Sequence, residues 1–185
     1  MKRFLIFTSF ISLFSLSSCG ECEDKTLQVS DNLANWLPYT IETDISFLDQ
    51  NNQRLNYTIS PNVSVRTLRD DDCSTTTIQP YIVMENIDQA KFLNVWLNRD
   101  EDLLGDRDQL WATLNENDQN IGSGAINNVG NPDLIATSVT LNGAIFNEVI
   151  TLDLNKNSDF AMRIFLQKNI GLVGFEYEDS LWVIE

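Results

Sequence analysis

The sequence predicts an all-β domain, an antiparallel meander that curves into a barrel or half-barrel, with a two-sheet β-sandwich as the alternative. Three observations predict it. From residue 36 onward, apolar side chains recur mostly at every second position, which is the period of a strand. The runs are short and are bounded by Asn, Asp, Gly and Ser, the residues of tight turns. Almost no segment has the length and period of the helix that joins parallel strands.

Twelve segments have the composition of strands, because β-branched and aromatic residues are frequent in them. In chain order they are Leu37–Ile41, Ile45–Asp49, Arg54–Ser60, Val63–Leu68, Thr76–Met84, Lys91–Leu97, Leu110–Leu114, Leu134–Leu141, Phe146–Leu154, Ala161–Gln167, Gly171–Tyr177 and Leu181–Ile184. The links between most of them are short, so consecutive strands are expected to pair as hairpins.

Three polar links are expected to form hairpin tips, since Asn and Asp tolerate the left-handed backbone of a tight turn. They are Asp49-Gln50-Asn51-Asn52, Asn155-Lys156-Asn157-Ser158 and Glu178-Asp179-Ser180. The last of these joins the two C-terminal strands. We expect Trp182 to be at least partly buried there, against the alternating Val173, Phe175 and Tyr177 of the neighbouring strand.

Two stretches have helical character, Leu27–Trp36 and Asp100–Trp111. The second contains Gly105, which costs about 1 kcal/mol relative to Ala inside a helix. We therefore expect an acidic loop with at most a turn or two of helix there. Residues 115–132 are rich in Asn and Gly and are expected to form a long surface excursion.

The charge of the chain excludes one class of partner. Its 185 residues include 27 acidic and 12 basic side chains and no His, for a formal net charge of −15. Such a chain has no basic face to displace the counterions of nucleic acid, and an anionic membrane surface would repel it. Contact with a membrane therefore requires a separate anchor. The length of the chain favours a single domain.

The first nineteen residues provide such an anchor. Lys2 and Arg3 precede an apolar run, Phe4–Leu16, which is too short to span a bilayer and typical of a secretory signal. Leu16-Ser17-Ser18-Cys19 resembles the bacterial lipobox. The resemblance implies a signal peptide over residues 1–18, a lipidated tether over 19–30 that begins with an acylated Cys19, and a β-rich domain over 31–185. Two or three acyl chains such as palmitate hold a protein on a bilayer far longer than one.

The remaining cysteines, Cys22 and Cys73, favour a disulfide, because an even number of thiols in an exported protein is usually oxidised. Closing this loop would stabilise the fold by about 4 kcal/mol in the simple chain model. Two free thiols or an intermolecular bond through Cys22 are the alternatives. A closed zinc site is not expected, since it needs four ligands.

The acidic tether and several motifs of the domain also resemble those of a protein family. The acidic residues behind Cys19, in Gly20–Asp24, resemble the export signal of surface lipoproteins in Bacteroidota. The other motifs are Trp36-Leu37-Pro38-Tyr39, Leu141-Asn142-Gly143, Gly171-Leu172-Val173-Gly174-Phe175 and Leu181-Trp182-Val183. With the lipobox, they resemble small lipoproteins of Bacteroidota, especially flavobacteria. The resemblance implies an Asn-Gly hairpin, a closing C-terminal hairpin and an outer-membrane location, and no catalytic residue.

Little in the sequence points to catalysis. Without His, neither a Ser–His–Asp triad nor a Cys–His pair can form. Glu176 and Glu178 lie on one face of a strand and are the candidate pair for a carboxylate hydrolase. The calcium candidates are Asp70-Asp71-Asp72, Asp100-Glu101-Asp102 with Asp106 and Asp108, and Asp153, Asn155, Asn157 and Asp159. A solvated acidic loop explains each of these sets better, so no metal and no cofactor is predicted.

The sequence therefore predicts a non-catalytic binding or scaffolding module on the outer membrane, facing the cell surface or the periplasm. Its partner is expected to be a protein or a glycan. One alternative is a carrier of a lipid-like ligand inside the curved sheet, and the other is the carboxylate hydrolase. A cavity of roughly several hundred Å³ lined by aromatic residues would favour the carrier.

Overall fold

The computed structural model describes residues 24–70, 73–86, 91–102, 105–116, 119–127, 135–156, 162–177 and 180–185, and these residues form twelve strands and one short helix. The strands are β1 (Lys25–Gln28), β2 (Thr43–Leu48), β3 (Arg54–Asp70), β4 (Cys73–Asn86), β5 (Lys91–Asp102), β6 (Gly105–Glu116), β7 (Gln119–Asn127), β8 (Ala136–Leu141), β9 (Ala144–Lys156), β10 (Met162–Gln167), β11 (Gly171–Tyr177) and β12 (Ser180–Ile184). The helix α1 is Asp31–Ala34. The fold class is all-β, as predicted.

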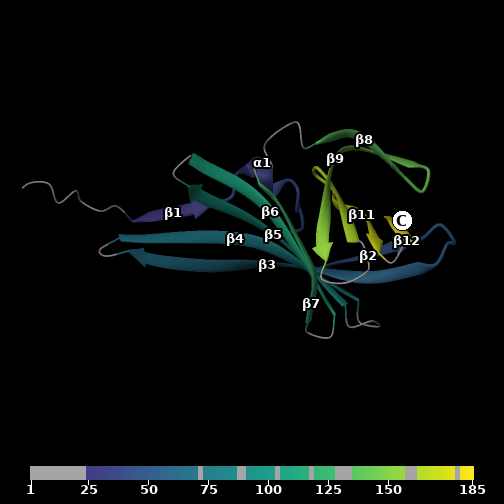
Figure 1. Cartoon of the computed structure of the whole chain (residues 1–185), viewed down its shortest axis with the longest axis horizontal. Coiled ribbons are helices and arrows are strands. Elements are labelled where there is room, and N and C mark those ends of the chain that lie inside the picture. The colour runs from purple at the N-terminus through teal and green to yellow at the C-terminus, as the bar shows by residue number, and fades with distance from the viewer. Residues whose placement is uncertain are drawn as a thin grey trace, which may run out of the picture.

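The twelve strands belong to one strongly curved sheet (Figure 1). Its order is β1-β4-β3-β2-β12-β11-β10-β9-β7-β6-β5, with β8 added to β9. β4 also pairs with β5, which brings the last strand of this order back beside β4. All pairs are antiparallel except β1 with β4, which is parallel. This is the predicted curved meander, and the two-sheet sandwich is not formed.

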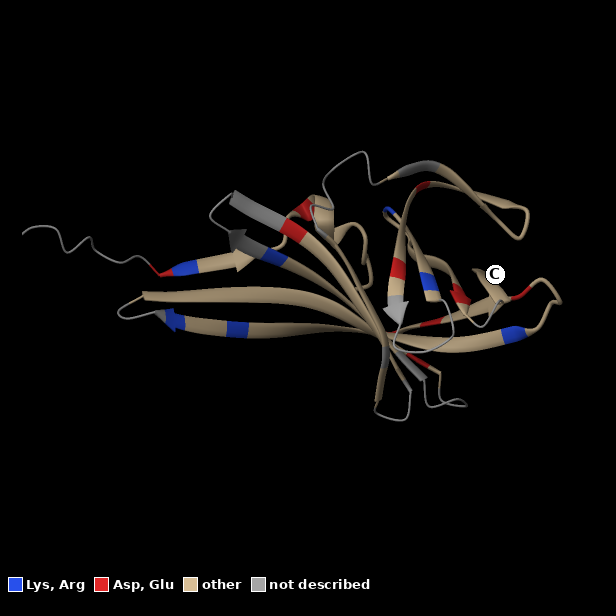
Figure 2. Ribbon diagram, viewed as in Figure 1, with Lys and Arg blue, Asp and Glu red and all other residues tan. Residues whose placement is uncertain are grey.

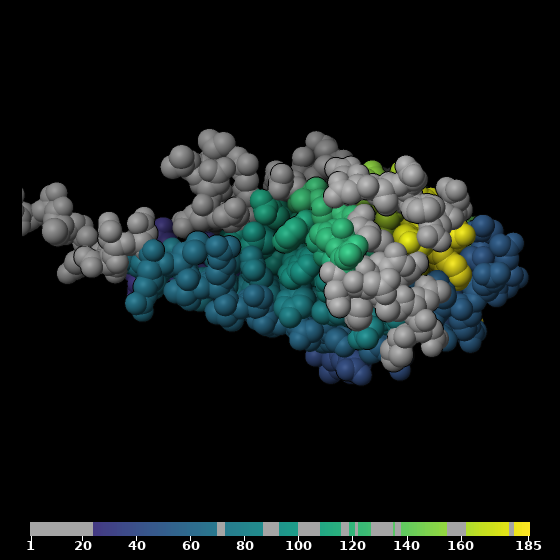
Figure 3. All heavy atoms as spheres, turned by 60° about the horizontal axis from the view of Figure 1, so that its bottom comes forward, coloured from purple at the N-terminus to yellow at the C-terminus, as the bar shows by residue number. Residues whose placement is uncertain are grey.

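The arm of β3 and β4 is longer than the sequence predicts. A break was expected at Pro61-Asn62, but β3 continues through both residues and pairs with β4 as far as Asp70. Pro61 lies two positions beyond Ile59, the last residue of β3 that pairs with β2. A residue without an N–H is tolerated where the strand becomes an edge. The arm projects from the body of the molecule, with β1 beside it (Figures 1 and 3).

Two loop predictions are wrong for the residues that the structure describes. These are the acidic loop at Asp100–Trp111 and the surface excursion at residues 115–132. Residues 100–102 belong to β5, residues 105–111 belong to β6, and the pair Asp102↔Gly105 ends this hairpin. Beyond it, β6 continues to Glu116 and β7 pairs back along it. Gly105 is the first residue of β6 and does not lie inside a helix. Pairing with long neighbours supplies hydrogen bonds that outweigh the weak strand preference of Asp, Asn and Gly.

The predicted N-terminal helix is reduced to the single turn α1. The residues before it form β1, which pairs with β4, and Leu37–Ile41 after it is not a strand. Ser30 caps α1, because its side chain accepts a hydrogen bond of 3.2 Å from the Leu33 backbone N–H. Leu33 and Trp36 are almost completely buried. The helix therefore contributes apolar side chains that fill one end of the curved sheet.

The predicted turns in the described residues are present. Asp49 accepts hydrogen bonds from the backbone N–H groups of Asn51 and Gln53, and Asn52 has a φ of 60°. Asn142 and Gly143 have φ values of 46° and 84°, the geometry of the expected Asn-Gly hairpin. The other two tips include residues 157–158 and 178–179, which lie outside the described residues.

The C-terminal hairpin forms as predicted, since Phe175 lies opposite Trp182 and the two rings stack at 6.2 Å. Trp182 is buried. Val173 does not join them, because the register between β10 and β11 shifts beside it. It packs instead in a cluster on the convex face of the sheet with Leu141, Val149, Phe165 and Val183. The hairpin of β8 and the first half of β9 arches over this side (Figure 1).

The main core fills the concave face. It is contributed by α1 and by strands from every part of the sheet, and its completely buried members include Phe47, Ile59, Val95, Leu97, Leu110, Ile164, Leu166 and Leu172. The side chains of α1 close one end of this core. A pocket lies between side chains at the other end of the strands.

Candidate binding pocket

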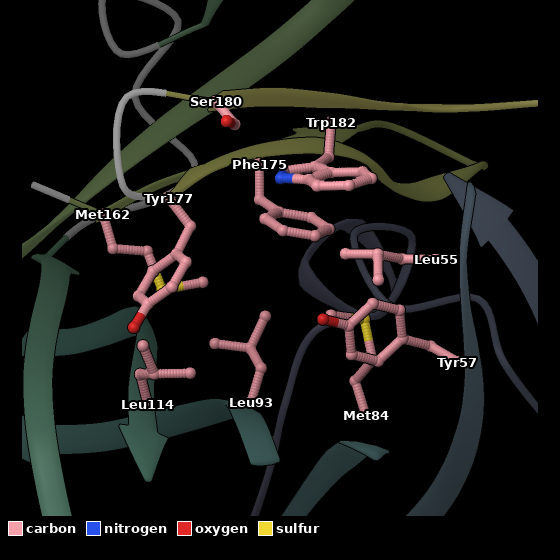
Figure 4. A pocket seen from close by; sticks show the side chains of 10 residues that line it. All are labelled: Leu55, Tyr57, Met84, Leu93, Leu114, Met162, Phe175, Tyr177, Ser180 and Trp182. Carbon is pink, nitrogen blue, oxygen red and sulfur yellow. The ribbon is translucent and has the colours of Figure 1, made fainter. Parts of the chain in front are cut away.

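A pocket of about 160 Å³ lies inside the curved sheet, near the C-terminal end of β11 (Figure 4). It is surrounded by β3, β4, β5, β6, β10, β11 and β12. Its lining residues are Leu55, Tyr57, Met84, Leu93, Leu114, Met162, Phe175, Tyr177, Ser180 and Trp182. Most of them stand near the ends of their strands, where the chain leads into segments that the structure does not describe.

Register explains why these side chains meet. Met84 lies opposite Leu93, and Leu93 lies opposite Leu114, so the three form one row across β4, β5 and β6. On the other side, Met162 lies opposite Tyr177. Side chains that are opposite one another in a sheet point to the same face. Two rows from distant parts of the chain therefore face each other across the pocket, as Figure 4 shows.

The wall beside Trp182 is an aromatic cluster. Phe47, Tyr57 and Phe175 contact one another edge to face, with ring centroids 5.1 to 5.9 Å apart. Phe175 also stacks on Trp182 with an interplanar angle of 16°. Such contacts add about 0.5–1.5 kcal/mol per pair to the effect of burial. This wall is therefore held in place by the core and not by a ligand.

The polar groups of the lining are few and neutral. They are the hydroxyl of Ser180, the phenols of Tyr57 and Tyr177 and the indole N–H of Trp182, and the other six side chains are apolar. The ten lining residues include no Asp, Glu, Lys or Arg. Burying a charged ligand here would leave its charge without a partner, which is strongly unfavourable. The pocket is suited to an uncharged and mainly apolar group.

The size of the pocket limits what it can hold. Ligand sites for drug-sized molecules measure about 300–1,000 Å³, and an apolar cavity of about 150 Å³ in a protein core stays dry and takes up benzene. The pocket of about 160 Å³ corresponds to the second class. Its aromatic lining is the lining expected of a lipid carrier, but its volume is smaller than the volume expected. The pocket holds one ring or a short alkyl segment and not a whole lipid.

Glu176, the described member of the candidate carboxylate pair, does not line this pocket. Glu176 lies between the inward-facing Phe175 and Tyr177 and therefore points to the convex side. There it pairs with Arg163 at 3.2 Å, and Arg163 also donates a hydrogen bond of 2.6 Å to Asp153. The hydrogen bond with Asp153 raises the pKa of the Arg163 guanidinium. Glu178, the second member of the pair, lies outside the described residues.

The calcium candidates are only partly described. Asp153 is engaged by Arg163, and Asp108 accepts a hydrogen bond of 2.7 Å from the Ser30 hydroxyl. In the part of the chain that the structure describes, no group of three or more Cys, Asp or Glu side chains could hold a metal ion. The other candidate side chains lie outside the described part, namely Asp70, Asp71, Asp72, Asp100, Glu101, Asp102, Asp106, Asn155, Asn157 and Asp159.

The lipidation and disulfide predictions fall mostly outside the structure. Cys19 and Cys22 lie outside the described residues. Cys73 is the first residue of β4, and its pairing with Cys22 stays a prediction. Next to it, the backbone N–H and the hydroxyl of Ser74 both donate to the Asp24 carboxylate at 2.8 Å. The hydroxyl bond is the main cause that lowers the pKa of Asp24.

No family model, no curated protein and no solved structure matches the chain. No helix among the described residues has the length and apolar character needed to span a membrane. The ligand class therefore has to be inferred from the pocket and from the surface of the sheet.

Proposed function

We propose that the protein is a non-catalytic binding module, attached to the outer membrane through acyl chains on Cys19, and that the pocket binds a small apolar group. The group has the size of one aromatic ring or of a short alkyl segment. The observation that carries this proposal is the pocket of about 160 Å³ with its preformed aromatic wall.

The pocket supports a carrier that binds only one end of a lipid-like ligand, because a whole lipid exceeds the volume of the pocket. A ligand with a larger polar or apolar remainder would place only one end in the pocket. That end would stack on Phe175 and Trp182, and each CH₂ group removed from water would contribute about 0.8 kcal/mol. The carboxylate hydrolase gains no support from Glu176, which is paired with Arg163 on the opposite face.

Fluorobenzene is a suitable probe for the test. The melting temperature of the purified full chain in detergent should rise in a saturable way as fluorobenzene is added, because a ligand that binds only the folded state stabilises it. Leu93→Phe fills the pocket from its floor and should abolish this rise. Leu93→Ala enlarges the pocket and should admit butylbenzene, which the wild-type protein should exclude.

The matched control is Leu97→Ala. Leu97 is buried on the same face of the same strand as Leu93 but does not line the pocket. This variant should lose stability as Leu93→Ala does, by about 2–5 kcal/mol, without any change in the size of ligand accepted. An equal fluorobenzene response in the wild type and in Leu93→Phe would refute the proposed site, and so would the absence of any response.

A further inference from the structure

A row of three aromatic rings crosses the convex face of β4, β5 and β6. Tyr81 lies opposite Trp96, and Trp96 lies opposite Trp111. The ring centroids are 6.0 Å and 5.1 Å apart, with interplanar angles of 28° and 29°. On β5, Val95 and Leu97 on either side of Trp96 are completely buried in the core. The aromatic row is therefore separate from the pocket and lies on the other side of the sheet.

The row has an open end at Trp111. In β7, the residue opposite Trp111 is Ala125, which is itself exposed and too small to cover an indole. Trp111 is 46% exposed, although Trp is usually well buried. Stacking between the strands explains the contacts of Trp96. It does not explain why the last indole of the row is nearly half exposed to solvent.

A row of side-chain amides lies beside the aromatic row. Gln79 donates a hydrogen bond of 2.6 Å to the Asn98 carbonyl oxygen, and Asn98 donates one of 3.3 Å to Gln109. Gln109 is two residues before Trp111 on β6, so both side chains stand on the same face. The Gln109 oxygen accepts from Asn98, and its amide NH₂ group provides donors next to the open indole.

The residues of these rows carry no charge, and the nearest described charges flank them, Glu85 on β4 and Asp153 on β9. On the other side of the aromatic row lie Val83, Asn94 and Thr113, which are opposite one another in register. The three rows thus contain nine uncharged residues in a chain with a net charge of −15. Most of β4 is free of charged residues in Figure 2. An acidic partner would be repelled by the chain as a whole, and a basic partner would find no carboxylate in these rows.

We propose that this face binds a neutral glycan, with one sugar ring stacked on the exposed indole of Trp111. The C–H groups of a sugar ring pack against an aromatic face, and sugar hydroxyls accept and donate hydrogen bonds as side-chain amides do. Gln109 bonds the hydroxyls of the stacked ring, and Ala125 leaves room for that ring. The next sugar residues lie along the amide row toward Asn98. The site is flat and uncharged, which suits a neutral chain of several sugars.

The test uses three neutral hexasaccharides, cellohexaose, mannohexaose and maltohexaose, titrated by calorimetry against the full chain in detergent. At least one should bind, and Trp111→Ala should weaken its affinity at least tenfold. Gln109→Ala should weaken it several-fold. Ile145→Ala is the control, because Ile145 is 69% exposed on β9 and lies outside the three rows, and it should bind as the wild type does.

Trp111→Phe guards against a folding defect in Trp111→Ala, since it keeps an aromatic face and should retain part of the affinity. Binding that is unchanged in Trp111→Ala would overturn the proposal, as would no binding of any of the three at millimolar concentration. The inference does not depend on the pocket. Leu93→Phe should leave glycan affinity unchanged, so failure of one site is distinguishable from failure of the other.

Discussion

The phenol oxygen of Tyr39 accepts a hydrogen bond of 3.0 Å from the backbone N–H of Leu172, 133 residues further along the chain. The bond fastens the segment after α1 to the start of β11. A second bond, of 2.7 Å, runs from the Asn169 N–H to the Asn35 carbonyl oxygen nearby. The end of the sheet that α1 fills is thus held by specific polar contacts, whereas the pocket lies at the other end.

Tyr39→Phe should destabilise the fold by about 1–3 kcal/mol, because the Leu172 N–H loses its acceptor in a buried position. Chemical unfolding followed by Trp fluorescence measures this change. Tyr39→Leu, which removes both the oxygen and the ring, should cost more. An unchanged unfolding midpoint in Tyr39→Phe would show that water replaces the phenol at no cost.

The same residue predicts an alkaline limit of stability. Burial raises the pKa of the Tyr39 phenol above its ordinary value of 10.0. The unfolded chain therefore loses this proton at a lower pH than the folded protein does. The contribution of the protonated Tyr39 phenol to the free energy of unfolding is complete below pH 10. It is lost as the pH rises from 10 through the folded-state pKa. Tyr39→Phe should show a shallower fall of stability above pH 10 than the wild type, measured by urea unfolding at several pH values.

Gly171→Ala should destabilise the protein more than Gly143→Ala. Both glycines have positive φ, +92° and +84°, so Ala costs about 1–2 kcal/mol in backbone strain at each. A Cβ at Gly171 would also lie 2.5 Å from the Tyr39 hydroxyl, whereas nothing lies within 4 Å of one at Gly143. We expect an extra cost of about 1–3 kcal/mol for Gly171→Ala. Equal unfolding midpoints for the two variants would contradict this packing.

Most of the fold follows from local pattern in the sequence. The period-two alternation gives the bounds Gly171–Tyr177 correctly, although the register shift turns Val173 to the other face. Asn142-Gly143 is a turn signal that needs no tertiary information. The errors have a common cause. Pro61 is a strand breaker by local preference, and the acidic segment around Gly105 has the composition of a loop. Pairing with a long partner strand overrides both local preferences. The parallel pairing of β1 with β4 gives no local signal, since its partners are 50 residues apart.

The pocket could be predicted only in part. Two of its four aromatic members, Phe175 and Trp182, follow from the pairing of the C-terminal strands. Met84 and Met162 could not be recognised, because an apolar residue near a strand end looks the same whether it fills a core or lines a cavity. The sequence does not distinguish Tyr81, Trp96 and Trp111 from aromatic residues that fill a core. The open end of this aromatic row at Trp111 depends on the β6–β7 pairing with Ala125, which lies in a segment expected to be a loop.

A further prediction is a disulfide between Cys22 and Cys73. Asp24 is bonded to Ser74, and Cys22 and Cys73 lie two residues and one residue before them. Two residues of chain span at most about 7 Å, a length compatible with the Cα separation in a disulfide. Peptide mapping without reductant should recover the two cysteines in one linked fragment. Asp24→Ala should slow the reformation of this bond after reduction. Recovery of Cys22 as a free thiol from freshly isolated protein would exclude the pairing.

The last prediction concerns the anchor. Leu16-Ser17-Ser18-Cys19 has the form of a lipobox, and a domain with a net charge near −15 would leave an anionic membrane unless acyl chains held it there. Cys19→Ser should abolish the incorporation of labelled palmitate and leave the precursor uncleaved. Cys22→Ser is the matched control, since it changes a cysteine three residues away without touching the lipobox. It should remain labelled, cleaved and membrane-bound. Labelling that persists in Cys19→Ser and vanishes in Cys22→Ser would move the anchor to Cys22.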